Sequence, residues 1–262
     1  MTHQPTPQAT HQATLTGRAA LVTGGGSGIG RSIALALARN GCRVVILGRR
    51  EQALNDTVQQ DESGRITAVT ADVREPDQVD RALEHVLQQV GVIDILVNNA
   101  GGQFVAPAEE ISHKGFRAVT RLNLDATWYL TTKVAATSML PAGFGKIICI
   151  TMTPRRGMPG MSHSSASRAA VESLVRTWAA EWGRRGIRAV AIAPGIVHPE
   201  AIDRYGLDPA AMASVVPLGR LQRPEEIADL VCFLAGPTGD YVTGTTIVMD
   251  GGLDVSGPHP LQ

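Results

Sequence analysis

A glycine-rich turn constrains the fold of this chain more than any other stretch. It reads Thr-Gly-Gly-Gly-Ser-Gly-Ile-Gly over residues 23–30, follows the apolar run 19–22 and precedes 31–38, where apolar residues recur at helical spacing. A strand that turns on glycines into a helix directs free backbone N–H groups and the positive end of the helix dipole at one point, which suits a pyrophosphate. A flexible loop is the alternative, but the flanking strand and helix favour dinucleotide binding.

The glycines of this turn have separate tasks. One makes the tight turn, one admits the phosphate to the backbone, and one lets the helix pack on the sheet. The residues expected to hold the cofactor here are Gly24, Ser27, Gly28, Ile29 and Gly30.

Apolar strand patterns alternate with helical patterns along the rest of the chain. Further strands are expected at 42–47, 66–71, 92–97, 146–150, 188–193 and 245–249. This alternation predicts one α/β domain with a Rossmann-type, doubly wound parallel sheet of about seven strands and helices on both faces. Ligands of such sheets bind at the carboxyl ends of the strands.

The ends of the pattern indicate the domain boundaries. Residues 1–16 are rich in Thr, Gln, Pro and His and lack the apolar stretch of a secretory signal, so we expect a disordered tail followed by one domain over 17–262. Periodicity is lost over 198–221, which indicates a lid over the substrate.

Composition excludes several classes of partner. Lys+Arg and Asp+Glu both number 24, so the net charge is zero and nucleic acid is disfavoured. No apolar run is long enough to span a membrane. Cys42, Cys149 and Cys232 lie in apolar segments without metal-ligand spacing, which predicts buried reduced thiols, no metal site and a cytoplasmic location.

The end of the second strand bears on the choice of cofactor. An acidic residue about 20 positions beyond the glycines commonly holds the ribose 2′-hydroxyl of NAD. Here Arg49 and Arg50 occur instead, and two guanidinium groups suit a 2′-phosphate, so NADP is predicted rather than NAD. The alternative is that Arg50 and Glu51 merely open a solvent-exposed helix.

Other strand ends supply further candidate cofactor contacts. A carboxylate and a backbone amide after the third strand suit adenine, and glycine-containing segments follow the fourth and sixth strands. The expected contacts are Asp72, Val73, Asn99, Ala100, Gly101, Pro194, Gly195, Ile196 and Val197.

Five motifs in order resemble the short-chain dehydrogenase/reductase family. They are Thr-Gly-x-x-x-Gly-x-Gly at 23–30, Asn-Asn-Ala-Gly at 98–101, Asn123, Pro-Gly at 194–195, and Tyr-Val-Thr-Gly through Asp-Gly-Gly over 241–252. The resemblance covers residues 17–252 and implies a nicotinamide-dependent oxidoreductase that forms a homodimer or homotetramer. Trp128, Trp178 and Trp182 lie on the two helices that pair between subunits in this family, although packing within one chain explains any one of them equally well.

The catalytic set of that family is altered here. The family uses a Ser, a Tyr, a Lys four residues after the Tyr, and a helix Asn. The resemblance places Thr151 at the Ser, Ser164 at the Tyr and Arg168 at the Lys, and only Asn123 is intact. A serine hydroxyl is too weak an acid to replace a phenol, which disfavours ordinary alcohol or ketone chemistry.

Two subfamilies share such losses, the 2,4-dienoyl-CoA reductases and the peroxisomal trans-2-enoyl-CoA reductases. The second is the closer match, over 101–104, 107–109, 112–115, 203–206, and His163-Ser164 with Arg168. The resemblance implies NADPH-dependent reduction of the 2,3 double bond of an enoyl thioester such as an acyl-CoA. The alternatives are an alcohol or aldehyde dehydrogenase that recruits another tyrosine, and a catalytically silent NADP-binding protein.

Enoyl reduction needs hydrogen-bond donors for an enolate oxygen, and the Thr151 and Ser164 hydroxyls are candidates. Arg168 would grip the ribose hydroxyls of the cofactor as the family's Lys does, but it cannot act as a titrating relay. Asn123 would hold a water or keep its helix locally open, or alternatively be satisfied by its own helix backbone.

Four further residues are assigned to the substrate. Gln103 belongs to the resembling stretch 101–104, and Arg155 and Arg156 follow the fifth strand, where they suit CoA phosphates or form a solvated pair. Tyr205 lies in the expected lid, as a proton donor or as a packing residue. His163 beside Ser164 is open to the same two interpretations, proton donor or polar neighbour of the site.

Overall fold

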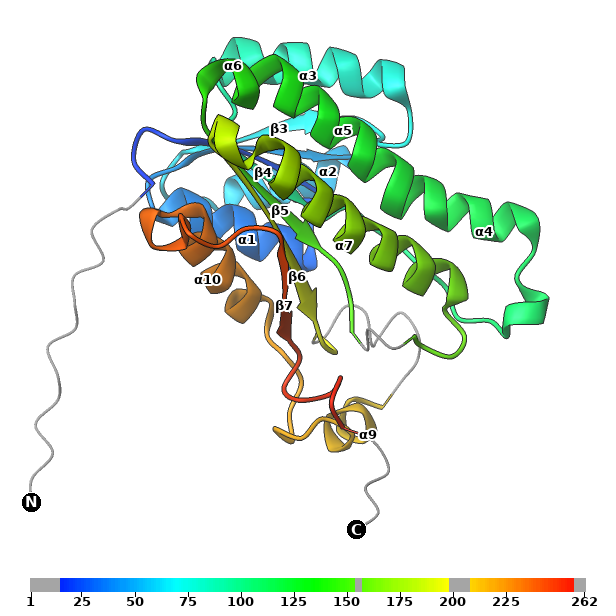
Figure 1. Ribbon diagram of the computed structural model, residues 1–262. Helices are drawn as coiled ribbons and strands as arrows, with labels where there is room; N and C mark the ends of the chain where they lie inside the picture. The colour runs from blue at the N-terminus through cyan, green and yellow to red at the C-terminus, as the bar shows by residue number, and fades with distance from the viewer. Residues whose placement is uncertain (1–14, 154–156, 198–207, 257–262) are drawn as a thin grey trace, which may run out of the picture.

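One twisted sheet forms the centre of the molecule (Figure 1). The computed structural model describes residues 15–153, 157–197 and 208–256. Within these residues, seven parallel strands pair in the order β3-β2-β1-β4-β5-β6-β7. They are β1 (Ala19–Thr23), β2 (Arg43–Gly48), β3 (Ile66–Thr70), β4 (Ile95–Asn98), β5 (Gly145–Ile150), β6 (Ile187–Pro194) and β7 (Thr245–Met249). The order confirms the doubly wound sheet predicted from the sequence.

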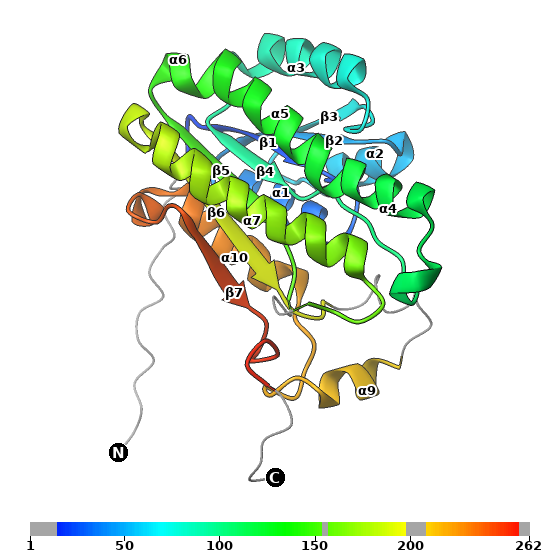
Figure 2. The ribbon, with the colours of Figure 1, turned by 45° about the vertical axis from the view of Figure 1, so that its right-hand side comes forward.

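Helices cover both faces of this sheet (Figures 1 and 2). The helices α1 (Gly28–Arg39) and α10 (Pro224–Ala235) pack on one face, and α3 (Pro76–Val90), α5 (Ala126–Val134) and α7 (Ser162–Trp182) pack on the other. The other α-helices of the described residues are α2 (Glu51–Gln59), α4 (His113–Thr120), α6 (Leu140–Ala142) and α9 (Pro209–Ser214). Among these described helices, none has the length and apolar character needed to cross a bilayer.

The strands are apolar on both sides because parallel sheets are covered on both faces. Every residue of β1 and of β5 is buried, whereas the edge strand β7 is partly exposed. The carboxyl ends of β6 and β7 point toward α9 (Figure 2). Residues that follow the strands therefore gather at one edge of the sheet, where a ligand of this fold binds.

The fourth strand begins later than the sequence predicts. The apolar pattern suggested 92–97, but Val92 is 41% exposed in the turn after α3, and β4 starts at Ile95. Asp94 bonds to Arg18 and to the backbone N–H of Ala19. The residues before β4 therefore form a turn at the amino edge of the sheet.

The packed part of the chain begins before residue 17. Leu15 is 1% exposed in the core, and its backbone N–H donates to the carbonyl oxygen of Asn40 at 3.0 Å. Leu15 falls within the predicted tail because one apolar residue among polar ones carries no periodic pattern. The structure corrects that boundary.

The segment expected to be a lid has regular structure in its described half, residues 208–221. Asp208 caps α9 by accepting a hydrogen bond from the backbone N–H of Ala210, and Val216 and Leu221 are buried. A helix of six residues is too short for its periodicity to be read from the sequence. Residues 198–207 lie outside the described part of the chain.

Candidate functional site

The glycine turn between β1 and α1 forms a cradle that side chains would fill. Gly24 and Gly28 have φ angles of +68° and +50°, in the left-handed region that favours glycine. A Cβ on Gly30 would overlap the carbonyl oxygen of Gly24 and lie 2.5 Å from the Nδ2 atom of Asn99. Because α1 begins at Gly28, its amino end lies in this cradle and fits the pyrophosphate of a dinucleotide.

The segment after β4 is tied to the end of β1. The hydroxyl oxygen of Thr23 accepts hydrogen bonds from the backbone N–H groups of Asn99 at 3.0 Å and Ala100 at 2.9 Å. The side-chain amide of Asn99 donates to the carbonyl oxygen of Thr23 at 3.0 Å. These bonds bring Asn99, Ala100 and Gly101 beside the glycine turn, as expected for residues that share one ligand.

Two exposed arginines follow β2 beside the same turn. The Arg50 guanidinium donates to the hydroxyl of Ser27 at 3.2 Å, and Arg49 lies close enough to Asp72 to help lower the pKa of that carboxyl group. The largest cause of that low pKa is the Arg74 guanidinium, which donates to both carboxylate oxygens of Asp72. The Asp72 carboxylate, which the sequence predicts to contact adenine together with Val73, is therefore already paired with Arg74.

Helix α7 presents a polar stripe to the sheet, formed by Ser164, Arg168 and Glu172. These residues are four apart and therefore share one side of the helix. Arg168 Nη1 donates to the carbonyl oxygen of Ile150 at 2.8 Å, and a Cβ on Gly101 would collide with the Arg168 guanidinium. Burial lowers the pKa of Arg168 to about 10, so the group remains charged at neutral pH. A fixed positive charge thus lies beside the loop after β4.

The hydroxyl of Thr151 is directed into the protein. Its oxygen lies 3.3 Å from a carboxylate oxygen of Glu172 and 3.2 Å from the carbonyl oxygen of Ile192, and the residue is 4% exposed. Both neighbours are acceptors, so they compete for the single hydroxyl proton. Sequence reasoning did not include Glu172, although its spacing from Ser164 and Arg168 could have indicated it.

The hydroxyl of Ser164 also has a partner within the protein. Ser164 is fully buried, and its hydroxyl donates to the Oε1 atom of Gln103 at 2.7 Å. The sequence assigned these two residues to different roles, and the structure brings them into direct contact.

Asn123 lies in a π-helical segment, Arg121–Asp125, between α4 and α5. Its side-chain oxygen accepts a hydrogen bond from the backbone N–H of Gly102 at 2.9 Å, and its nitrogen donates to the Gly102 carbonyl oxygen at 3.0 Å. The interpretation that its own helix backbone satisfies this side chain is wrong. Asn123 instead clamps the segment after β4.

His163 precedes Ser164 in the first turn of α7. Its Nδ1 atom accepts a hydrogen bond from the backbone N–H of Ser164 at 2.7 Å, and its ring meets that of Phe104 edge to face at 4.3 Å. The ring is fully buried, and burial lowers the pKa of His163, so the neutral form is favoured. His163 therefore supports the loop that carries Gln103.

The residues after β6 reach the same edge of the sheet. The backbone N–H of Gly195 donates to the carbonyl oxygen of Met249, and the Pro194 carbonyl oxygen accepts from the Thr153 hydroxyl at 3.0 Å. Ile196 and Val197 follow directly, and Val197 forms a bridge with Gln222. Three predicted substrate residues, Arg155, Arg156 and Tyr205, lie outside the described part of the chain.

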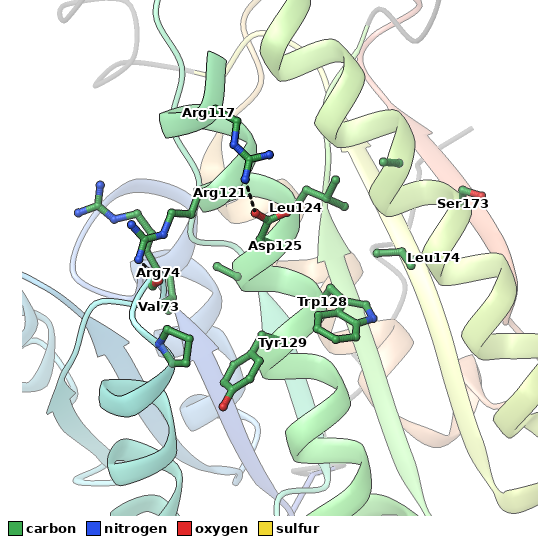
Figure 3. Close-up of a pocket in the computed structure, with 13 residues that line it drawn as sticks. Val73, Arg74, Arg117, Arg121, Leu124, Asp125, Trp128, Tyr129, Ser173 and Leu174 are labelled. Atoms are coloured by element: carbon green, nitrogen blue, oxygen red, sulfur yellow. Dashed lines mark hydrogen bonds and ion pairs between the residues drawn. The ribbon is translucent and has the colours of Figure 1, made fainter. Parts of the chain in front are cut away.

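A cavity of about 720 Å³ lies away from this edge, along α5 and α7 (Figure 3). Trp128, Tyr129 and Leu174 line it, and Arg117 and Arg121 lie toward one end, where Arg117 pairs with Asp125. Among the described residues that are predicted to bind ligands, only Val73 lines it. This hollow is therefore distinct from the glycine cradle.

Comparison with known proteins agrees with this architecture. The family model described as enoyl-(acyl carrier protein) reductase matches residues 24–254. The chain is 36% identical to a probable 2,4-dienoyl-CoA reductase of Bacillus subtilis, over 93% of this chain and 98% of that protein. It is 35% identical to the gluconate 5-dehydrogenase of Gluconobacter oxydans, over 92% of this chain and 96% of that protein.

A solved structure shows the same fold. The crystal structure of a short-chain dehydrogenase from Bacillus anthracis matches with a TM-score of 0.84 and 37% identity, over 93% of this chain and 99% of that one. Sequence, fold and glycine cradle agree, and the chain belongs to the short-chain dehydrogenase/reductase family of nicotinamide-dependent oxidoreductases.

Proposed function

We propose that the protein reduces the 2,3 double bond of an enoyl thioester with NADPH. The observation that carries this proposal is the lack of a phenol at the site among the described residues. Ser164 occupies the position of the family's Tyr. The Tyr129 hydroxyl donates to the carboxylate of Asp80 at 3.0 Å, and Tyr241 is fully exposed beyond α10. The described side chains thus offer neutral donors and a cation, which suit an enolate better than an alkoxide.

The residues around the glycine cradle fit NADPH. The cradle would hold the pyrophosphate, and the paired charges of Arg49 and Arg50 favour a 2′-phosphate. Arg168, charged and held by the carbonyl oxygen of Ile150, would bind the ribose hydroxyls next to the nicotinamide. When bound, the reduced nicotinamide supplies the hydride for the reaction.

The side chains at the site would then stabilise the negative charge that forms on the substrate. Addition of hydride to the β-carbon of an enoyl thioester moves negative charge to the thioester oxygen. Polar N–H and O–H groups preorganised around that oxygen lower the barrier, and no protein acid has to be consumed. The α-carbon then takes its proton from water. An arginine at position 168 retains its charge throughout, so it cannot exchange protons with the substrate.

Several features of this proposal concern residues beyond the described part of the chain. We assign the CoA phosphates to Arg155 and Arg156, and we assign Tyr205 to the cover of the acyl chain. A cytoplasmic location fits the three free thiols, because burial raises the pKa of Cys42, Cys149 and Cys232 to about 12 and keeps them protonated.

A second candidate is oxidation of a polyol or related alcohol. The relative from Gluconobacter oxydans is named a gluconate 5-dehydrogenase, and 35% identity is similar to that of the dienoyl-CoA reductase relative. This chemistry would require a phenol at the site, and Tyr205 is the remaining tyrosine of the chain.

Parallel assays of cofactor oxidation separate these functions. Purified protein is mixed with NADPH or NADH and with a trans-2-enoyl-CoA, a 2,4-dienoyl-CoA or a simple ketone. We expect turnover with a thioester and NADPH at least about tenfold above the ketone rate, and the same preference in the Tyr205→Phe variant. Ketone reduction that disappears in that variant would establish the alcohol dehydrogenase instead. No turnover with any substrate would leave a binding role.

We also propose that the protein is a homo-oligomer that associates through α5 and α7. Enzymes of this family commonly oligomerise, and the exposed face along these helices carries Trp128, which is 49% exposed at the cavity of Figure 3. Large exposed aromatic side chains that border a hollow are typical of interfaces. A second copy of the chain would cover this face.

A further inference from the structure

We infer that Thr57, together with Arg31, is a positioning residue that holds the glycine turn in the shape that binds the dinucleotide. Neither residue is among the cofactor contacts predicted from the sequence. The inference concerns any nicotinamide dinucleotide, so it does not depend on the substrate or on the preference for NADPH proposed above.

Thr57 lies on α2, and its hydroxyl group is buried against the glycine turn. The residue is 0% exposed, and its hydroxyl donates to the carbonyl oxygen of Gly25 at 3.0 Å. A threonine within a helix commonly donates to the carbonyl oxygen four residues earlier. That acceptor, the Ala53 oxygen, lies 3.2 Å from the hydroxyl oxygen, so Gly25 offers the shorter contact. A polar group of α2 therefore reaches the turn, 32 positions away in the sequence.

Arg31 links this hydroxyl to the next residue of the turn. Its Nε atom donates to the Thr57 hydroxyl oxygen at 3.1 Å, and its Nη2 atom donates to the carbonyl oxygen of Gly26 at 2.7 Å. A hydroxyl that accepts from a guanidinium group becomes a stronger donor, because the two hydrogen bonds polarise one another. One guanidinium and one hydroxyl thus hold two successive carbonyl oxygens.

Helix α2 also contacts the turn at other points. A Cβ on Gly26 would lie 3.2 Å from the Cβ of Ala53, and the Arg50 guanidinium at the amino end of α2 donates to the Ser27 hydroxyl. Positions 50, 53 and 57 are three and four residues apart, a spacing that places them on one side of a helix. The turn is therefore packed along one side of α2.

The glycines need this support because their backbone is permissive. A glycine adopts several backbone conformations at little cost, so the peptide groups next to Gly25 and Gly26 can rotate. In a trans peptide the carbonyl oxygen points opposite to the N–H of the next residue, so a rotated peptide group exchanges the positions of the two. An oxygen that faces a pyrophosphate repels it, whereas an N–H attracts it. Hydrogen bonds to both carbonyl oxygens keep these peptide groups in one orientation.

A positioning role predicts the same effect on every dinucleotide. If the turn of a variant adopts the binding arrangement in about one fifth of the molecules, each ligand that needs this arrangement binds about fivefold more weakly, whatever its other contacts. Loss of a contact to the 2′-phosphate would weaken the binding of NADPH alone. The ratio of the two affinities therefore distinguishes a positioning residue from a residue that touches the phosphate.

Isothermal titration of the cofactor-free protein tests this role. We expect Thr57→Val, which removes the hydroxyl but has a similar shape, to raise the dissociation constants of NADPH and of NADH by about fivefold each. Thr57→Ser returns the hydroxyl and should restore both constants to within about twofold of the wild type. Arg31→Lys keeps the positive charge but loses the forked geometry, so it should also weaken both cofactors by about fivefold.

Thr137→Val is the matched control for the loss of a threonine hydroxyl. Thr137 is an exposed helical threonine that donates to the carbonyl oxygen of Lys133, and its replacement should leave both dissociation constants within about twofold. Circular dichroism shows whether each variant is folded at the temperature of the titration. Arg31→Lys, at a partly buried side chain, tests the contact without altering the buried position 57.

Two results would overturn the inference. Unchanged affinities in Thr57→Val and Arg31→Lys would show that the Thr57 hydroxyl serves only its own helix, through Ala53. A loss confined to NADPH would place the changed residue at the 2′-phosphate instead. A protein that reduces no enoyl thioester could still show the expected binding pattern, so the inference and the proposed function fail separately.

Discussion

The proposed function depends most on one side chain, at position 164. A buried serine there cannot release or accept a proton near neutral pH as a phenol does, and its hydroxyl is already bound to Gln103. Four residues later, Arg168 keeps the positive charge that the family's Lys supplies but loses the ability to titrate. Under the proposed function, Arg168 would hold the ribose of the cofactor, and neither residue would supply a titrating acid.

The two arginines after β2 make the cofactor preference testable. We expect Arg49→Gln and Arg50→Gln each to raise the dissociation constant of NADPH by about tenfold, because each removes a charge-assisted contact to a 2′-phosphate. The affinity for NADH should stay within about twofold, since it carries no phosphate there. Isothermal titration of both cofactors measures this.

The matched control for these variants is Arg65→Gln. Arg65 is an exposed arginine just before β3, at the opposite edge of the sheet from the glycine cradle. If Arg49→Gln weakened the binding of NADPH and of NADH by the same factor, Arg49 would not contact the 2′-phosphate.

Sequence alone located the residues that local geometry dictates. The glycine turn could be predicted because only glycines fit the left-handed φ angles and the overlap at Gly30. The contact between Ser164 and Gln103 could not, because the two residues are 61 positions apart and meet only when α7 packs beside the loop after β4. Likewise Thr151 could be placed at the site, but the contact of its hydroxyl with the Ile192 carbonyl oxygen could not be predicted.

At the scale of elements, the apolar strands were predictable and their ends were less so. β1 and β5 are continuous apolar runs that the sheet buries completely. Val92 has the same apolar character as a strand residue, yet it lies in an exposed turn, so β4 begins at Ile95. The short helix α9 carries no full apolar period, so only the structure reveals it.

The amino end of α7 makes the stability of the fold depend on pH. Protonation of His163 would break the hydrogen bond from the Ser164 N–H and place a positive charge at a helix amino end. Burial lowers the pKa of His163 below its ordinary value of 6.5, so the unfolded chain binds the proton more readily. The contribution of neutral His163 to the free energy of unfolding is therefore fully present above about pH 6.5, and it is lost progressively as the pH falls below 6.5.

Chemical denaturation between about pH 5 and pH 8 measures this effect. The free energy of unfolding of the wild type should decrease toward the acidic end, by at most about 1.4 kcal/mol per pH unit for one proton. His163→Gln should flatten the curve, whereas His113→Gln, at an exposed histidine, should leave its slope unchanged. If the free energy of unfolding of His163→Gln still decreased toward acidic pH with the wild-type slope, the pH dependence would belong to another titrating group.

At the scale of the whole molecule, the order of the strands brings the candidate residues within the described part of the chain toward one edge of a single sheet. The doubly wound topology could be predicted because strands and helices alternate without interruption, and the structure confirms it. The start of the fold at Leu15 and the cavity along α5 and α7 could not be predicted, because both arise from packing between elements distant in sequence.

The exposed face of α5 provides a test of assembly. Trp128→Glu should convert the oligomer to a smaller species, because it places a charge where a second copy would bury an aromatic ring worth about 2 kcal/mol or more. Size-exclusion chromatography with light scattering gives the mass directly. Val92→Glu, at another exposed apolar residue, should leave the mass unchanged. An unaltered mass in Trp128→Glu would place the subunit contact elsewhere.

The polar stripe of α7 has a consequence for how this protein can change over generations. Ser164, Arg168 and Glu172 each engage a different part of the structure: the loop after β4, the end of β5 and the Thr151 hydroxyl. If one of these three side chains were replaced, the polar group that it contacts would lose a hydrogen-bond partner inside the protein. Adaptation toward new substrates is therefore easier on the loops around the site, and this helix is the part that descendants are expected to inherit unaltered.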